Sequence, residues 1–466
     1  MNNSTKYLVI ILMLICLPSL ASAALPITID TLEVSTGFLT SKNTLPFWTW
    51  VNQNGRVPTQ HSTLSTQNSF FTRLRINKHP NTEKDIDWFY GLDVTDRTNA
   101  TQALIFTDAY TGLTYKQFRI TLGRKAETFG LADSLLSSGS EVYTQNAPTI
   151  PKIALSTNGY IDLTDWLAFN AYLAHGWMGT DQYVKHAYIH QKYFYLRFGS
   201  SDPDNGVNFF TGFHDIASWG GDNLPSSFKD YLNVFTGKGG TVGSIYDQQN
   251  ALGDHRGTIE FALQQKDPDR DWYLYAQTMF EDASGFRFWY PGDLLFGVSM
   301  INKNPDTPIA RLNLELLDTR YDGNSLTPTD MDNYFKNFEY SGWVHQGYAI
   351  GTTFIPFIQS ENNWFEPLNK VQVINASIIL HITKHLNPRI RLARIQNFGS
   401  FDNPHTRQPK NHNIRHRHNK HNTNSQKLDP DPANSPRRRK NHPPKPGPGP
   451  DHKKTNKLTL LPSTKN

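Results

Sequence analysis

The segment PIARLNLELL, residues 308–317, alternates apolar and polar side chains along its length. One set of alternate positions is apolar: Ala310, Leu312, Leu314 and Leu316. The other set is polar: Arg311, Asn313 and Glu315. Successive side chains of a β-strand point to opposite faces of a sheet. The segment therefore predicts a strand with one apolar and one polar face.

The same period of two recurs along the chain, in QFRITLGR (117–124), RGTIEFALQQ (256–265) and KVQVINASIILHI (370–382). A soluble β-sandwich would show the same alternation, so one strand decides nothing. The recurrence, together with 28 Phe, 20 Tyr and 10 Trp, favours an all-β protein with a large antiparallel transmembrane β-barrel. Aromatic side chains flank the turn SSDPDNG (200–206) and are predicted to form a lipid-facing band and girdle: Tyr193, Tyr195, Phe209 and Phe210.

The N-terminus predicts export. Lys6 precedes an apolar run that ends in Ala21, Ser22 and Ala23, the order of a secretory signal peptide over residues 1–23. The apolar run is shorter than the ~20 residues of a membrane-spanning helix. The only cysteine, Cys16, lies in this segment, so the mature chain is predicted to have no disulfide. We expect residues 61–402 to form the barrel in the outer membrane.

Residues 403–466 differ in composition from the rest. They contain 15 Lys and Arg against 3 Asp and Glu, which leaves 31 basic and 38 acidic residues in 1–402. No Phe, Tyr or Trp follows Phe401, so this His-, Lys-, Arg- and Pro-rich tail is predicted to be disordered. It could bind metal or a polyanion, or be a solvated tail. The abrupt loss of aromatics favours a shifted reading frame. The acidic body gives no reason to expect nucleic-acid binding.

Catalytic signatures are scarce. The sequence contains no HExxH, GxSxG or P-loop motif. Glu281 and Asp282 are adjacent, so on a strand they would face opposite ways and make a poor acid–base pair. We therefore expect no enzymatic activity, cofactor or metal site.

Three neighbourhoods place aromatic rings beside charged or polar groups, a combination suited to the apolar faces and hydroxyls of sugars. The nine candidate polysaccharide-binding residues are Asp215, Trp219, Asp222, Asp282, Arg287, Trp289, Tyr334, Trp343 and His345. The alternative for the tryptophans is an anchor at a membrane interface.

Collinear segments over roughly residues 30–402 resemble the capsule assembly Wzi-like outer-membrane proteins, in the version common in Bacteroidetes-type bacteria. The matching segments are STGFLTSKNTLPFW (35–48), LGRKAETFGL (122–131), LLSSGS (135–140), QNAPTIPKI (145–153), FHDIASWGGD (213–222), QNALGDHRG (249–257), QTMFEDASGFRFW (277–289) and DNYFKNFEYSGWVHQGYAIGTTFIPF (332–357).

The resemblance implies a barrel of 16–18 strands, incomplete here if the tail is real, because the family pattern ends after RIRLARIQNFGSFDNP (389–404). It also implies a short periplasmic segment over residues 24–60. It further implies lectin-like binding of capsular or exopolysaccharide and a role in capsule assembly or attachment. The partners would be that polymer, outer-membrane lipid and other capsule export proteins, and the protein would be a monomer. Two alternatives remain, an outer-membrane diffusion porin and a secreted glycan hydrolase.

Overall fold

The structure is a computed structural model that describes residues 28–41, 45–58, 67–98, 102–202, 204–281, 293–321, 333–360, 363–383, 386–401 and 403. The predicted signal peptide and, except for Asn403, the predicted tail lie outside these residues. All described residues belong to one compact unit, Met1–Arg415.

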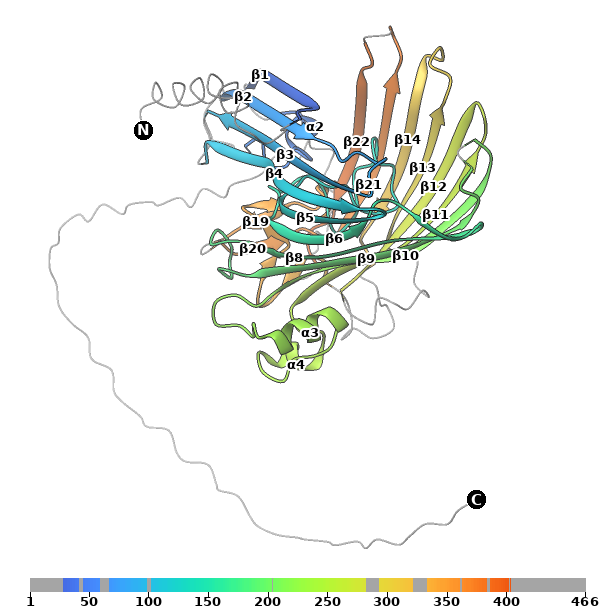
Figure 1. Ribbon diagram of the computed structural model, residues 1–466. Helices are drawn as coiled ribbons and strands as arrows, with labels where there is room; N and C mark the ends of the chain where they lie inside the picture. The colour runs from blue at the N-terminus through green and yellow to red at the C-terminus, as the bar shows by residue number, and fades with distance from the viewer. Residues whose placement is uncertain are drawn as a thin grey trace, which may run out of the picture. The chain divides into compact units, whose positions relative to one another are not determined.

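One antiparallel sheet of sixteen strands forms most of this unit, and its strands pair almost entirely in chain order (Figure 1). The strands are β1 (Thr31–Ser41), β2 (Gln67–Lys78), β3 (Ile86–Arg97), β4 (Leu104–Tyr115), β5 (Phe118–Arg124), β6 (Lys152–Thr157), β7 (Ile161–Thr164), β8 (Leu167–Trp177), β9 (Tyr188–Gly199), β10 (Gly206–Trp219), β11 (Asp254–Lys266), β12 (Arg270–Phe280), β13 (Leu294–Asn302), β14 (Ile309–Asp318), β21 (Val371–Leu380) and β22 (Arg389–Asn397). Strand β7 pairs only with β8, beside the main path.

The two faces of the sheet have opposite polarity. On β14, Leu314 is 49% exposed, whereas its neighbours Asn313 and Glu315 are 0% and 1% exposed. The exposed face carries large apolar side chains from many strands, among them Phe106, Leu113, Phe118, Ile120, Leu122, Ile153, Leu155, Phe194, Phe209, Leu263, Phe296, Leu312, Leu316 and Ile374. This inversion, apolar outside and polar inside, is the pattern of an outer-membrane barrel. It confirms the all-β fold predicted from the alternation.

The aromatic residues around the β9–β10 turn do not all face outward. Phe209 is exposed as predicted, but Tyr195 and Phe210 are buried on the inner face. Tyr193 also faces inward, where its hydroxyl donates to Asn170 at 3.1 Å. The hydroxyl of Tyr195 donates to the Glu260 carboxylate at 2.9 Å. The girdle prediction was therefore wrong for Tyr193, Tyr195 and Phe210. The phenol groups of the two tyrosines have polar partners inside, and Phe210 packs in an inner apolar cluster, against the ring of Tyr160.

Two segments between strands fill the inner side of the sheet, and we call residues 125–151 and 333–370 the plug. Its second segment contains three short hairpins: β15 (Lys336–Asn337) with β16 (Ser341–Gly342), β17 (Val344–His345) with β18 (Tyr348–Ala349), and β19 (Phe357–Gln359) with β20 (Phe365–Pro367). A buried cluster joins plug residues such as Val142, Trp343 and Phe354 to Val371 and Val373 of β21. The apolar core of this unit therefore lies inside the curved sheet.

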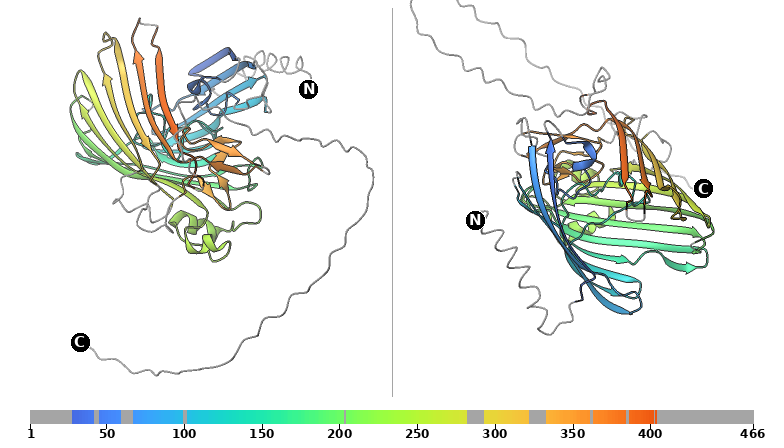
Figure 2. Two further views of the ribbon diagram at one scale, coloured as in Figure 1. Left: turned by 180° about the vertical axis from the view of Figure 1, so that it is seen from behind. Right: turned by 90° about the horizontal axis from the view of Figure 1, so that it is seen from above.

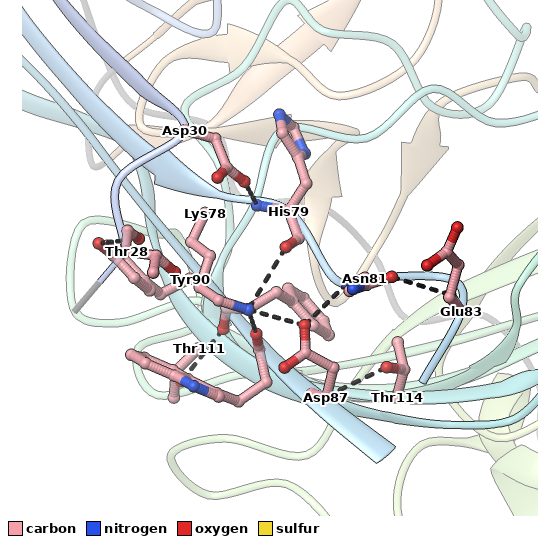
Figure 3. Close-up of polar contacts among 12 residues, drawn as sticks. Thr28, Asp30, Lys78, His79, Asn81, Glu83, Asp87, Tyr90, Thr111 and Thr114 are labelled. Atoms are coloured by element: carbon pink, nitrogen blue, oxygen red, sulfur yellow. Dashed lines mark hydrogen bonds and ion pairs between the residues drawn. The ribbon is translucent and has the colours of Figure 1, made fainter. Parts of the chain in front are cut away.

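Short turns and long connections lie at opposite ends of the sheet, as expected for such barrels. Turns such as 116–117 and 267–269 join strands at one end, and the long connections 125–151, 220–253 and 319–370 lie at the other. At the short-turn end, Lys78 Nζ lies 2.8 Å from Asp87 Oδ2, and the Asn81 N–H donates to the same oxygen at 2.7 Å (Figure 3). These contacts fix the β2–β3 turn. The His79 N–H of this turn donates to the Asp30 carboxylate at 2.6 Å, which ties the start of β1 to it.

Strands β1 and β22 form the two ends of the sheet, and no pairing joins them among the described residues (Figure 2). Strand β1 pairs with β2 over its whole length, from Thr31 opposite Asn77 to Ser41 opposite Gln67. The sheet thus begins well before the boundary at residue 61 that the sequence predicts, because β1 has the same alternation, with Leu32, Val34 and Phe38 exposed. No helix in the described part of the chain is long and apolar enough to cross a membrane.

Candidate functional site

A cavity of about 830 Å³ lies on the inner side of the sheet, within the size range of ligand pockets. Three parts of the chain line it: the short helix α2 (Phe47–Trp50) with the residues that follow it, plug residues between Glu127 and Gln145, and Arg389–Arg391 at the start of β22. Its wall combines aromatic rings, carboxylates, serines and guanidinium groups.

Trp48 is the central aromatic side chain of this wall. The guanidinium of Arg391 lies over the Trp48 ring, 5.2 Å from its centre, and donates to the backbone oxygen of Leu135 at 2.7 Å. Trp48 also meets the ring of Phe354 edge to face, with the ring centres 5.8 Å apart. The cation and ring contacts together hold the indole in one orientation.

Each of the two acidic groups of the cavity is paired with a cation from the sheet. Asp133 accepts from Arg311 Nε at 2.8 Å and from the backbone N–H groups of Leu135 and Leu136. Glu127 lies 3.1 Å from Lys152 Nζ and accepts from the Tyr172 hydroxyl at 3.0 Å. Burial acts to raise the pKa of Glu127, but the charges of Lys152 and Lys125 outweigh it, so this pKa is lowered and the group is ionised.

Four residues of the lining carry buried polar atoms that have no hydrogen-bond partner in the described part of the chain. These atoms are Trp48 Nε1, Asn52 Oδ1, Ser140 Oγ and Arg391 Nε. Buried polar atoms are nearly always paired with protein, water or a ligand. Water or a ligand in the cavity could supply the missing partners of these atoms. No group of three or more His, Cys, Asp and Glu among the described residues could hold a metal ion.

Three of the sequence-predicted residues lie in the plug, and all three are buried. The indole N–H of Trp343 donates to the Val142 oxygen at 2.8 Å, which ties the two plug segments together. Nδ1 of His345 lies 2.8 Å from Gln182 Nε2, and burial with nearby Arg124 lowers the pKa of His345 to about 3, so the imidazole is neutral. Tyr334 is 1% exposed and belongs to the same core.

Three other predicted residues lie on the outer side of the sheet or in the loop beyond it. Asp215 is buried between Lys192 at 3.0 Å and His255 at 3.2 Å. Trp219 is 3% exposed. Asp222 is exposed and lies 2.8 Å from Nδ1 of His186.

The sheet therefore separates Asp215 and Trp219 from Tyr334, Trp343 and His345, and Asp222 lies in a loop with its own partner, so the six do not form one cluster. The remaining predicted residues, Asp282, Arg287 and Trp289, lie outside the described residues.

The cavity residues were missed because none stands in a catalytic or metal-binding motif. A signal was nevertheless present. Trp48 ends the segment 35–48, Glu127 lies in 122–131, and Ser137 to Ser140 lie in 135–140. Three segments that carry the family resemblance thus converge on one wall of the cavity.

The family model of the capsule assembly protein Wzi matches residues 47–374. Among solved structures, the chain is similar to Wzi of Escherichia coli, an outer-membrane protein involved in group 1 capsule assembly and a carbohydrate-binding β-barrel. The two are 16% identical, with a TM-score of 0.50, over 78% of this chain and 70% of that one.

Two further similar structures are porin-type barrels. OmpF of Salmonella typhi is 9% identical with a TM-score of 0.38, over 78% of this chain and 89% of that one. The outer-membrane channel DcaP of Acinetobacter baumannii is 9% identical with a TM-score of 0.37, over 80% and 92%. No curated protein sequence matches the chain at a significant level.

Proposed function

The chain belongs to the capsule assembly protein Wzi family, and from this premise we propose that it is an outer-membrane barrel that binds capsular or exopolysaccharide. It would help to assemble that polymer or attach it to the cell surface, without enzymatic activity. Its partners would be the polymer, the surrounding lipid and other capsule export proteins, and it would act as a monomer after removal of residues 1–23.

The observation that carries this proposal is the cavity around Trp48. A sugar ring presents apolar C–H groups to an indole face and hydroxyls to the polar atoms around it. Trp48, Asn52, Ser140 and Arg391 supply both kinds of contact, and each has a buried polar atom without a partner among the described residues. The polar lining also orients a ligand by hydrogen bonds, which gives specificity.

We propose that the sequence-predicted residues act around this cavity, not as its wall. Asp222 is exposed in a long connection and could contact the polymer outside. Asp215, Trp219, Tyr334, Trp343 and His345 are buried, so they would position the loops and the plug. Asp282, Arg287 and Trp289 remain candidates for direct contact.

Binding of purified capsule-type polysaccharides, neutral and acidic, to the full chain in lipid nanodiscs tests the proposal. Trp48→Ala and Arg391→Gln should each weaken binding by about tenfold or more, since a stacked ring or a charged hydrogen bond contributes ~1.5–3 kcal/mol. Trp166→Ala is the matched control, because Trp166 is exposed on the β7–β8 turn. Equal binding by all three variants would contradict the role of the cavity.

A diffusion porin is the alternative function, and the plug argues against it. The buried core that joins Val142, Trp343 and Phe354 to β21 occupies the inside of the sheet. Single-channel recordings separate the two functions, because a plugged binding barrel should conduct far less than a porin of similar strand number.

A further inference from the structure

Helix α3 (Phe228–Thr236) packs on the outer face of the sheet. The β9 residue Gln191 points inward, where its side chain lies 2.9 Å from Lys152 Nζ. Its neighbours His190 and Lys192 therefore point outward. Lys192 Nζ donates to the Phe235 oxygen at 2.6 Å, and the ring of His190 lies 5.5 Å from that of Tyr231. In Figure 1, α3 and α4 (Ile245–Gln249) lie below the green strands β8–β10.

Caps at both ends and a buried core on one side stabilise helix α3. The Ser227 and Asp230 side chains form a capping box, and Gly237 ends the helix in a left-handed conformation (φ 65°). Val234 is buried with Trp219 and Leu252 in a small core between helix and sheet. This core holds one side of α3 in place, so the opposite side faces outward in a fixed orientation.

An apolar stripe runs along the exposed side of α3, and one edge of it, the Phe235 ring, also packs on His190 and Lys192 of β9. Phe228, Leu232 and Phe235 follow one another at positions i, i+4 and i+7 and are 75%, 46% and 39% exposed. Val242 and Ile245, in the following loop and at the start of α4, are also exposed. A water-facing helix would place polar residues at these positions.

The charges of this segment are asymmetric. Between residues 228 and 250 the charged side chains are Lys229, Asp230, Lys238 and Asp247. Both carboxylates are buried, whereas both lysines are exposed. The exposed charged side chains of residues 228–250 are therefore both positive.

The stripe also continues the lipid-facing face of the sheet. Phe194 of β9 belongs to the exposed apolar face, and His190, which lies under α3, is four residues from it toward the long-connection end. At ~3.3 Å per residue, the two positions are about 13 Å apart along the strand. This spacing puts α3 beside the end of the apolar band, at the level of lipid headgroups.

We propose that residues 228–245 form an interfacial anchor that binds the phosphorylated, anionic lipid of the outer leaflet. Phe228, Leu232 and Phe235 enter the boundary between headgroups and acyl chains, and Lys229 and Lys238 face lipid phosphates. The long connections lie on the extracellular side in such barrels, which assigns the anchor to the outer leaflet.

A spin label tests the anchor, because the sequence after Cys16 contains no cysteine. Phe228→Cys, labelled with a nitroxide in the full chain, is compared with Phe209→Cys on the lipid-facing strand β10 and with Asp204→Cys in the exposed β9–β10 turn. The vesicles are phosphatidylcholine with or without phosphatidylglycerol. The readout is accessibility of the label to oxygen relative to a water-soluble nickel complex.

We expect the oxygen-to-nickel ratio at residue 228 to exceed that at residue 204 by about threefold or more in the anionic vesicles, as for an interfacial side chain. The double substitution Lys229→Glu and Lys238→Glu should lower this ratio in those vesicles. A water-like ratio at residue 228, with a lipid-like ratio at residue 209, would overturn the anchor. Dipolar broadening at residue 228 would show that a second copy covers the stripe, and would overturn it also. A water-like label at residue 209 would overturn the membrane-embedded barrel itself, so the two failures are distinguishable.

Discussion

The carboxylate of Glu315 on β14 accepts a hydrogen bond of 2.9 Å from the backbone N–H of Ser138 in the plug. The same carboxylate accepts from the hydroxyls of Ser137 and Tyr275 and from the Asn375 amide at 2.7 Å. One side chain of the sheet thus satisfies four donors, two of them from the plug. The plug is attached to the sheet by buried charged hydrogen bonds as well as by apolar packing.

Replacing Glu315 by Ala should loosen the plug. The substitution leaves buried donors without an acceptor, and we expect a loss of about 2–4 kcal/mol in the free energy of unfolding. Denaturant unfolding in detergent measures this loss, and limited proteolysis within residues 125–151 should become faster. Glu83→Ala, in the exposed β2–β3 turn, is the control and should change neither. Unchanged proteolysis of the Glu315→Ala protein would contradict the attachment.

Replacing Leu314 by Arg tests the lipid-facing side of the sheet. A cation on this face costs about 2–4 kcal/mol at the centre of a bilayer and less near its edge. We therefore expect Leu314→Arg to fold in detergent but to insert poorly into vesicles. Ile358→Arg is the matched control, since Ile358 is exposed on the short strand β19, outside the main sheet. Equal insertion of both variants would show that Leu314 does not face lipid.

The sheet could be predicted because its signal is local. Leu312, Leu314 and Leu316 alternate with Asn313 and Glu315 within a few residues, and the structure keeps that alternation. The sequence predicts less well whether an aromatic side chain points to the inner or the outer face of the sheet. Tyr195 and Phe209 both lie in aromatic runs, but only Tyr195 has a partner, Glu260, on the inner face, and that partner is far away in the sequence.

The cavity was harder to predict for the same reason. Trp48 and Arg391 come from opposite ends of the described chain, and they meet only because the sheet curves around the plug. The plug segment 125–151 has no strand or helix periodicity that would indicate where it lies. The family resemblance marked several of these segments, but not which of their side chains share a wall.

Replacing Glu141 by Gln should change how stability depends on pH. Both carboxylate oxygens of Glu141 are buried in the plug without a hydrogen-bond partner among the described residues. Burial, with nearby Asp293 and Glu260, raises the pKa of Glu141 well above its ordinary value of 4.5. The folded protein therefore keeps a proton that the unfolded chain releases above about pH 4.5, which favours unfolding as the pH rises.

Glutamine cannot ionise, so the variant lacks this penalty. We expect Glu141→Gln to have a higher unfolding midpoint than the unsubstituted protein at about pH 7 and the same midpoint at about pH 4. Glu83→Gln, at an exposed position, controls for the loss of a charge. A Gln variant that is less stable at neutral pH would show that Glu141 is ionised and stabilising in the folded plug.

Replacing Gly297 by Ala should act on the plug through an aromatic ring. Gly297 on β13 lies opposite Tyr275 on β12, and a β-carbon at residue 297 would come within 2.1 Å of the Tyr275 ring. The ring must then move, which breaks the hydrogen bond from its hydroxyl to Glu315. We expect a loss of about 1–3 kcal/mol in the free energy of unfolding, the usual cost of overpacking.

Tyr275→Ala alone should also destabilise the protein. In the double variant, however, the methyl group has room, so the two losses should not add. Additive losses in denaturant unfolding would show that Gly297 and Tyr275 are not coupled, and that the attachment of the plug at Glu315 does not depend on this glycine.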